Sequence, residues 1–210
     1  MNSIFEFFFE QYAGYETTDV ILETIAIVFG LISVLFSKQN NVFVFPTGII
    51  STVIFVYLLL KWELLGDMMI NAYYFIMSIY GWYIWTYKVD DNNVTPISRM
   101  TLNEKKISTA IFLATLLFVY LVYQIFDKWT SWVAYIDTIT TAIFFVGMWL
   151  MARRKLENWV FWIIGDLISV PLYFYKGFTL TSFQYLIFTF IAVFGYLTWK
   201  RNINNNQQTV

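Results

Sequence analysis

Long apolar stretches, separated by short clusters of charged and turn-forming residues, run along the chain from residue 20 to residue 199. A helix needs roughly 20 apolar residues to cross a bilayer, and seven stretches approach that length. They predict spans at Val20–Phe36, Asn41–Leu60, Asp67–Tyr87, Ile107–Phe126, Trp132–Met151, Trp159–Tyr175 and Leu180–Trp199. The short alternating segments that are typical of a β-barrel do not occur. The pattern therefore predicts an all-α integral membrane protein with seven transmembrane helices.

Both ends of the chain differ from these spans. Residues 1–19 are predicted to form an amphipathic helix on the membrane surface, because their aromatic residues recur at helical spacing opposite two glutamates. These residues are Phe5, Phe8, Phe9 and Tyr12, opposite Glu6 and Glu10. Residues 200–210 form a polar tail, which is predicted to be disordered from Asn202 to Val210.

Composition agrees with a membrane protein and excludes several kinds of chemistry. The 210 residues are 59% hydrophobic and only 13% charged, about half the usual charged fraction. A net charge of −1 without a basic patch argues against a nucleic-acid partner. The sequence has no cysteine, no histidine and no phosphate-binding G-x-x-x-x-G-K-[ST] loop, so we expect no disulfide, zinc site or ATP-hydrolysing motor. We expect no cofactor and no metal, and partners limited to a small solute and membrane lipid.

Basic residues are distributed unequally between the two sides of the predicted bundle. Seven spans place 3 of the 13 Lys and Arg on the side of the N-terminus, namely Lys61, Lys128 and Lys176. The other 10 fall on the opposite side, including Lys38, the 153–155 cluster and Arg201. Because basic residues concentrate on the cytoplasmic side, the N-terminus is predicted outside and the C-terminus inside.

Two motifs recur in the same order in both halves of the chain. Asn41-x-x-x-Phe45-x-x-Gly48 opens the second span, and Asn158-x-x-x-Trp162-x-x-Gly165 opens the sixth. The aromatic segments 79–85 and 193–199, each with a glycine at the third position and a final tryptophan, close the third and seventh spans. The sequence thus predicts two parallel three-helix repeats, residues 20–87 and 131–199, joined by a linker and a fourth helix in residues 88–130. The alternative is chance, since glycine and tryptophan are common at helix ends near a membrane surface.

A carboxylate inside the sixth span is the leading candidate for a binding site. Trp159, Trp162 and Asp166 share one helix face at three- and four-residue spacing. A charged group in hydrocarbon is costly unless it faces the bundle interior, so its default interpretation is functional. Flat aromatic rings beside an anion suit a flat, cationic, partly apolar solute. Trp159 fits equally well as an interfacial belt residue.

Other polar residues in the spans are weaker candidates for the same site. Asp137 and Thr141 share a face of the fifth span, although Asp137 could instead pair with a neighbouring span and threonine often bonds back to its own helix. The third span contributes Asn71, Tyr74 and Ser78. Asn41 and Gln184 complete the set of candidate hydrogen-bonding groups. No residue is predicted to be catalytic.

These residues resemble the PnuC family of bacterial vitamin transporters. Asn158-Trp159-x-x-Trp162-x-x-x-Asp166 is similar to that family's W-x-x-W-x-x-x-[N/D] signature, and residues 78–85 are similar to its third span. The resemblance implies a 3+1+3 helix arrangement like that of the SWEET sugar transporters. It also implies facilitated uptake of nicotinamide riboside across the bacterial inner membrane, with trapping by cytosolic phosphorylation. Phe45 departs from the pattern, since many members have tryptophan there, and the signature does not separate nicotinamide riboside carriers from relatives resembling thiamine carriers.

Three classes of function remain open from the residues alone. A carrier would stack the pyridinium ring of nicotinamide riboside on Trp162 and use Asp166 or Asp137 for its charge, its ribose or a coupling proton. A retinal-type receptor would need a buried lysine, but Lys176 and Lys200 lie at span ends. An enzyme would have only two carboxylates on different helices for acid–base chemistry, so none is predicted. The sequence leaves the oligomeric state open, and a homo-oligomer is compatible with it.

Overall fold

Seven helices make up most of the part of the chain that the structure, a computed structural model, describes: residues 16–62, 65–90, 93–127, 129, 131–177 and 179–208. They are α2 (Thr17–Lys38), α3 (Val44–Lys61), α4 (Leu65–Thr86), α5 (Leu102–Ile125), α6 (Trp132–Ala152), α7 (Asn158–Tyr175) and α8 (Thr179–Gln208). Two short antiparallel strands, β1 (Lys88–Asp90) and β2 (Asn93–Val94), lie between α4 and α5. The all-helical prediction is confirmed, whereas the surface helix expected from Phe5 to Tyr12 lies outside the described residues.

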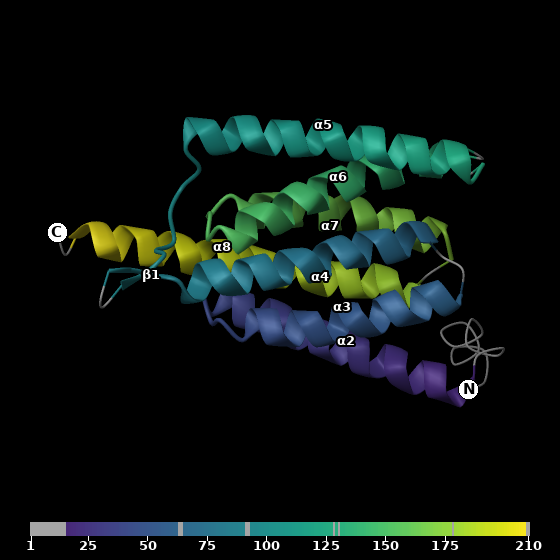
Figure 1. Ribbon diagram of the computed structural model, residues 1–210, viewed down its shortest axis with the longest axis horizontal. Coiled ribbons are helices and arrows are strands. Elements are labelled where there is room, and N and C mark those ends of the chain that lie inside the picture. Colours follow the sequence, from purple (N-terminus) through teal and green to yellow (C-terminus); the bar gives the residue numbers. More distant parts are fainter. Residues whose placement is uncertain are drawn as a thin grey trace.

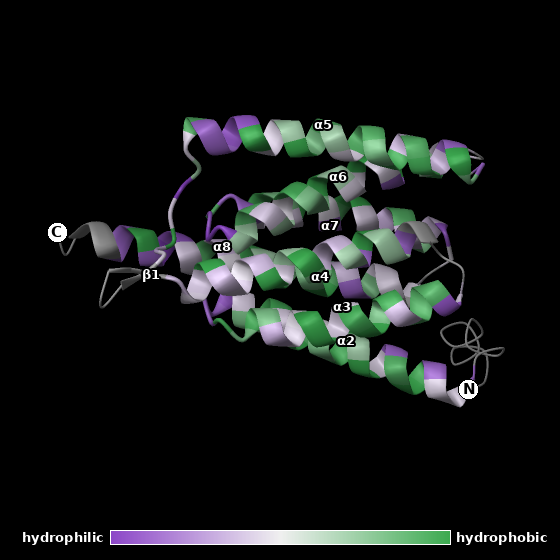
Figure 2. Cartoon of the chain, viewed as in Figure 1, coloured by the Kyte–Doolittle hydropathy of each residue, from purple (hydrophilic) through white to green (hydrophobic). Residues whose placement is uncertain are grey.

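Five of the helices are long and apolar enough to cross a membrane: α2, α3, α5, α6 and, within α8, Thr181–Asn205. Both α4 and α7 overlap predicted spans but contain several polar or amphipathic residues, including Asn71 in α4 and Asp166 in α7. Hydrophobic residues dominate the middle of most helices, and strongly hydrophilic residues gather near helix ends (Figure 2). The chain is a multi-pass membrane protein.

Packing divides the helices into two groups of three. Within the first group α3 packs against both α2 and α4, and within the second α7 packs against both α6 and α8. The groups meet where α4 contacts α6 and where α2 contacts α8. Helix α5 packs against α6 at the edge of the bundle (Figure 1). We call the end of the bundle that contains Lys38, Arg153, Arg154, Lys155 and Arg201 the basic end.

Local sequence signals determine where several helices begin and end. Thr101 and Glu104 form a reciprocal capping box that opens α5, which satisfies backbone donors that have no partner inside the helix. Left-handed residues follow the ends of three other helices: Asn40 at φ 55° after α2, Arg154 at φ 56° after α6 and Gly177 at φ 85° after α7. This conformation reverses the chain after a helix and costs least for glycine, so Arg154 needs compensating contacts.

The segment before α5 is bound to the loop between α6 and α7. Ser98 forms a parallel bridge with Lys155, and the backbone N–H of Leu156 donates to the Ser98 carbonyl at 2.9 Å. Glu104 accepts ion pairs from Lys155 at 3.0 Å and from Arg153 at 3.3 Å. These bonds fasten the start of α5 to the second helix group at the basic end.

The tail is helical where the sequence predicted disorder. Helix α8 continues without a break to Gln208, so the expectation of a disordered segment from Asn202 was wrong for the described residues. The physical reason is visible at Ile203, which packs against the hydrophobic core of the basic end. Packing of Ile203, one turn beyond Trp199, stabilises this extension of the helix, and it is not apparent from a run of asparagine and glutamine.

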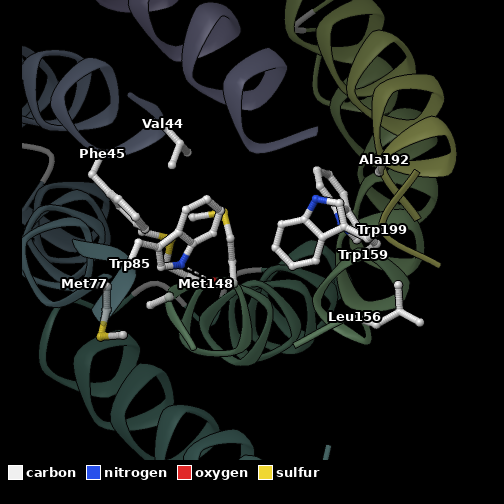
Figure 3. Close-up of a cluster of buried hydrophobic side chains, with 11 residues drawn as sticks. Val44, Phe45, Met77, Trp85, Met148, Leu156, Trp159, Ala192 and Trp199 are labelled. Carbon is white, nitrogen blue, oxygen red and sulfur yellow. Dashed lines mark hydrogen bonds between the residues drawn. The ribbon is translucent and has the colours of Figure 1, made fainter. Parts of the chain in front are cut away.

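The main hydrophobic core lies at the basic end and contains two similar aromatic pairs. Phe45 on α3 meets Trp85 on α4 edge-to-face, with ring centroids 5.0 Å apart and planes at 89°. Trp159 on α7 meets Trp199 on α8 in the same way, at 5.6 Å and 89°. The two pairs lie on opposite sides of this core (Figure 3). Edge-to-face contacts of this kind place the positive edge of one ring on the negative face of another.

A glycine lies beneath each of these pairs. A β-carbon at Gly81 would lie 2.3 Å from the ring of Phe45, and one at Gly195 would lie 2.6 Å from the ring of Trp159. Both distances are far shorter than an ordinary carbon contact, so only glycine lets the ring approach the neighbouring helix. The glycines of the two sequence motifs therefore serve close helix packing.

Candidate functional site

Asp166 is a buried carboxylate in the middle of α7. Its exposed fraction is only 2%. Within the described part of the chain, no hydrogen bond or ion pair reaches its side chain. The residue before it, Gly165, lies against the ring of Phe144, since a β-carbon there would be 2.3 Å from that ring. An anion in this position is costly unless something brings a positive charge or hydrogen bonds to it.

Trp162 lies one turn before Asp166 and is half-buried among aromatic rings from other helices. Its ring stacks on Phe144 of α6, with centroids 5.5 Å apart and planes at 29°. On the other side it approaches Tyr74 of α4, at 6.4 Å and 52°. Side chains from both helix groups therefore surround Trp162: Phe144 from the second group and Tyr74 from the first.

Tyrosines complete the surroundings of the carboxylate. Tyr74 and Tyr185 both lie close enough to Asp166 for direct electrostatic interaction. The Tyr185 ring is parallel to that of Phe144, at 6.0 Å and 8°, and its hydroxyl is hydrogen-bonded to that of Tyr173. We call Asp166, Trp162, Tyr74, Phe144 and Tyr185 the Asp166 cluster.

Sequence reasoning found three of these five residues and missed Phe144 and Tyr185. Tyr185 directly follows the predicted Gln184, which is half-buried on α8. Phe144 lies three residues beyond the predicted Thr141. Neither aromatic stands out among the 22 phenylalanines and 15 tyrosines of the sequence. Only their positions in space distinguish them, Phe144 against Trp162 and Tyr185 against Phe144.

Asp137 lies in a different electrostatic setting from Asp166. Both of its oxygens accept bonds from the Lys176 ammonium, at 2.7 and 2.9 Å, and the two side chains are 19% and 24% exposed. Its charge is thus neutralised within the chain. The Thr141 hydroxyl donates to the Asp137 carbonyl at 2.8 Å, which is a bond within its own helix. The alternative in which Asp137 ties neighbouring spans together agrees with this geometry.

The remaining predicted polar residues are dispersed over the bundle. Asn71 donates from its amide to the Asp67 carbonyl on the preceding turn of α4, at 3.0 Å. Ser78 is 3% exposed and lies near Gly48 of α3. At the basic end, the Asn41 side chain accepts a bond from the backbone N–H of Phe43 at 3.0 Å and so shapes the start of α3. These contacts of Asn71, Ser78 and Asn41 lie outside the Asp166 cluster.

Trp159 belongs to the core of the basic end rather than to an exposed belt. It is 2% exposed, and its ring packs against Trp199 and the backbone of Gly195. Among the described residues its indole N–H is buried without a hydrogen-bond partner. Its role in binding a solute stays a prediction.

The chain is similar to known membrane transporters in both sequence and fold. A family model described as nicotinamide mononucleotide transporter matches residues 20–201. The nicotinamide riboside transporter PnuC of Escherichia coli K12 is 23% identical over 209 residues, covering 89% of this chain and 87% of that protein. The riboflavin/roseoflavin transporter RibM of Streptomyces davaonensis is 25% identical over 179 residues, covering 82% and 81%. A crystal structure of the vitamin B3 transporter PnuC shares the fold, with a TM-score of 0.66 at 20% identity over 90% of this chain and 84% of that one.

Proposed function

The chain belongs to the nicotinamide mononucleotide transporter family that includes PnuC, and from this premise we propose that it carries nicotinamide riboside across the bacterial inner membrane. Transport by such a carrier requires no catalytic residue in the chain. The observation that carries the choice of solute is Asp166, a buried carboxylate without a partner among the described residues, next to a tryptophan.

The Asp166 cluster matches the chemistry of this solute. Nicotinamide riboside combines a flat cationic pyridinium ring, a carboxamide and a ribose. Trp162 offers a ring face for stacking and cation–π attraction worth about 2 kcal/mol when desolvated. Asp166 supplies the opposite charge, and the hydroxyls of Tyr74 and Tyr185 can bond the carboxamide or the ribose. Asp137 has no part in charge compensation here, because Lys176 already neutralises it.

Riboflavin and thiamine are the alternative solutes. The similarity to RibM favours riboflavin, whose ring system is flat but uncharged. A buried carboxylate gains from a cation and gains far less from a neutral ring, so the Asp166 cluster favours nicotinamide riboside over riboflavin. Thiamine also carries a flat cationic ring, and charge alone does not exclude it.

Two parallel three-helix repeats are proposed for α2–α4 and α6–α8, with α5 as the linker helix, in a SWEET-like 3+1+3 arrangement. Equivalent contacts support it at a constant spacing of 114 positions: 45 and 159, 81 and 195, 85 and 199. The left-handed residues 40 and 154 have the same spacing. This spacing aligns Phe45 with Trp159, whereas the sequence motifs suggested Trp162, which lies three residues further along. The motif register is therefore shifted by about one helical turn.

Transport by alternating access would rock one repeat against the other around the Asp166 cluster. The N-terminus is proposed to lie outside and the C-terminus in the cytoplasm, which makes the basic end the cytoplasmic end. Uptake is proposed to be passive, with cytosolic phosphorylation trapping the solute, because no hydrogen bond or ion pair within the described residues joins Asp166 to a relay group, although Asp67 acts electrostatically on the neighbouring Tyr185.

Titration of the purified protein with nicotinamide riboside, thiamine and riboflavin tests the choice of solute. Nicotinamide riboside should bind most tightly, and tighter binding of riboflavin would contradict the proposal. Liposomes containing the protein but no nucleotide should equilibrate labelled nicotinamide riboside without accumulating it, while protein-free liposomes serve as the control. Accumulation driven by a pH gradient would contradict passive transport.

A further inference from the structure

Two buried tryptophans cross-link the helix groups at the basic end. The indole N–H of Trp85 on α4 donates to the Met151 carbonyl of α6 at 3.2 Å. The indole N–H of Trp199 on α8 donates to the Ser37 carbonyl of α2 at 3.0 Å. Each bond therefore runs from the last span of one group to the first span of the other. The two tryptophans are 2% and 0% exposed, and their ring centroids are 5.8 Å apart.

Both accepting carbonyls lie in the last turn of a helix, where carbonyl groups lack intrahelical partners. Each also accepts one bond from the left-handed residue that follows, Asn40 onto Ser37 and Arg154 onto Met151, both at 2.9 Å. The tryptophan donors thus use the second acceptor position of these carbonyls. Removal of either donor would leave a buried acceptor with one bond fewer.

Arg154 reinforces one of the two cross-links. Its guanidinium lies 4.3 Å from the centroid of the Trp85 ring, and its side chain donates to the Thr95 carbonyl. Burial lowers the pKa of Arg154 to about 10, so it keeps its charge at neutral pH. A left-handed arginine costs backbone energy, and these contacts offset it. The equivalent position in the first helix group is Asn40, which has no such ring contact in the described structure.

We propose that Trp85 and Trp199 form the cytoplasmic gate of the carrier, with their two indole hydrogen bonds closing the basic end. The proposal rests on the proposed transport function and identifies the residues that its cycle must separate. Movement of the helix groups apart at this end breaks both bonds at once, because each one spans the two groups. Figure 3 shows Trp85 and Trp199 within the same buried cluster, where their ring centroids are 5.8 Å apart.

Two buried polar groups without hydrogen-bond partners destabilise the closed state of the gate relative to the open state. The indole N–H of Trp159 and the side-chain oxygen of Asn158 are buried without hydrogen-bond partners among the described residues. Both gain water when the basic end opens, whereas Trp85 and Trp199 exchange a protein acceptor for water. Opening therefore gives partners to two groups that the closed state leaves without any, which offsets part of the cost of exposing this core.

Cysteine accessibility measures the gate without any solute. The chain contains no cysteine, so Ala152→Cys introduces a single thiol at a position that is fully buried in the core of the basic end. In inside-out vesicles, an impermeant thiol reagent reaches this end from the bulk solution. The rate of labelling then reports the fraction of time that the basic end is open.

Trp85→Phe and Trp199→Phe keep one aromatic ring but remove the indole donor and the second ring that carries it, and the control below loses the same volume. Each should raise the labelling rate about fivefold, and the double variant should raise it more than either single variant. Trp82→Phe, at a tryptophan of the same helix that is 41% exposed, is the matched control and should leave the rate unchanged. Unchanged labelling in both gate variants, with the protein folded, overturns the proposal.

The variant Arg154→Gln and a counterflow measurement complete the test of the gate. If the phenylalanine variants fail to fold, Arg154→Gln retains both tryptophans and should still raise labelling severalfold, and an unchanged rate overturns the gate. Counterflow of labelled nicotinamide riboside is measured on the same vesicles. Raised labelling without counterflow in any variant supports the gate and refutes the proposed solute, whereas counterflow with unchanged labelling refutes the gate alone.

Discussion

Replacement of Gly165 by alanine should distort the Asp166 cluster without touching any of its polar groups. The new β-carbon would lie 2.3, 2.8 and 2.9 Å from three atoms of the Phe144 ring. Contacts this short do not persist, so the ring must move by about 1 Å to regain an ordinary separation. Because Phe144 stacks on both Trp162 and Tyr185, the displacement passes directly to the proposed solute site.

The magnitude follows from two opposing effects. Overpacking of a well-packed interior costs about 1–3 kcal/mol, while alanine in place of glycine within a helix returns about 1 kcal/mol. We expect a net loss of up to about 2 kcal/mol in stability and, since the aromatic platform moves, a drop of about tenfold in affinity for nicotinamide riboside.

Gly48→Ala on α3 is the matched control for this substitution. Its β-carbon would lie 3.1 Å from the hydroxyl of Ser33, which donates to the Val44 carbonyl, and 3.5 Å from that of Ser78, so shifts of a few tenths of an ångström suffice. The helix-propensity gain is the same, so this variant should be as stable as the parent or slightly more stable.

Thermal unfolding in detergent at one fixed scan rate, together with solute titration, measures both variants. Gly165→Ala should be less stable and bind more weakly than Gly48→Ala. Parental stability and affinity in Gly165→Ala would refute the close approach of α7 to Phe144 and, with it, the arrangement of the cluster.

Three further predictions concern the site, an ion pair and the topology. Trp162→Ala should lower affinity for nicotinamide riboside by at least about 1 kcal/mol, with part retained in Trp162→Phe; unchanged binding by titration would make Trp162 a packing residue. A double-mutant cycle of Asp137→Asn with Lys176→Met, scored by thermal unfolding, should give a coupling of about 1 kcal/mol, and zero coupling would argue against the ion pair. An impermeant thiol reagent on intact cells should label Thr17→Cys and not Asn204→Cys, and the reverse result would invert the topology.

The sequence predicted the helices well because hydropathy is a local property. Every predicted span overlaps one helix of the structure. It also placed Trp162 and Asp166 on one face of α7, since three- and four-residue spacing determines which side chains of a helix are neighbours. Both residues lie in the same cluster.

Local sequence patterns could not predict the contacts between segments that are far apart in the sequence. The ion pair that neutralises Asp137 comes from Lys176, 39 residues away, and nothing in the sequence selects that partner. Phe144 and Tyr185 join the site only because α6 and α8 flank α7 in space. The helical tail likewise depends on the packing of Ile203 against the core, a tertiary effect that overrides a weak local propensity.

The central claim is that Asp166 provides the negative charge for a cationic solute, and the charge dependence of binding tests it most directly. Purified parent protein and Asp166→Asn are titrated with nicotinamide riboside and with its uncharged reduced analogue. A buried bond to a charged group contributes about 1.5–3 kcal/mol, so the variant should lose tenfold or more in affinity for the cation. Its affinity for the neutral analogue should change by less than about threefold, since no charge is lost in that complex. Equal losses for both solutes, or no loss for either, would contradict the claim.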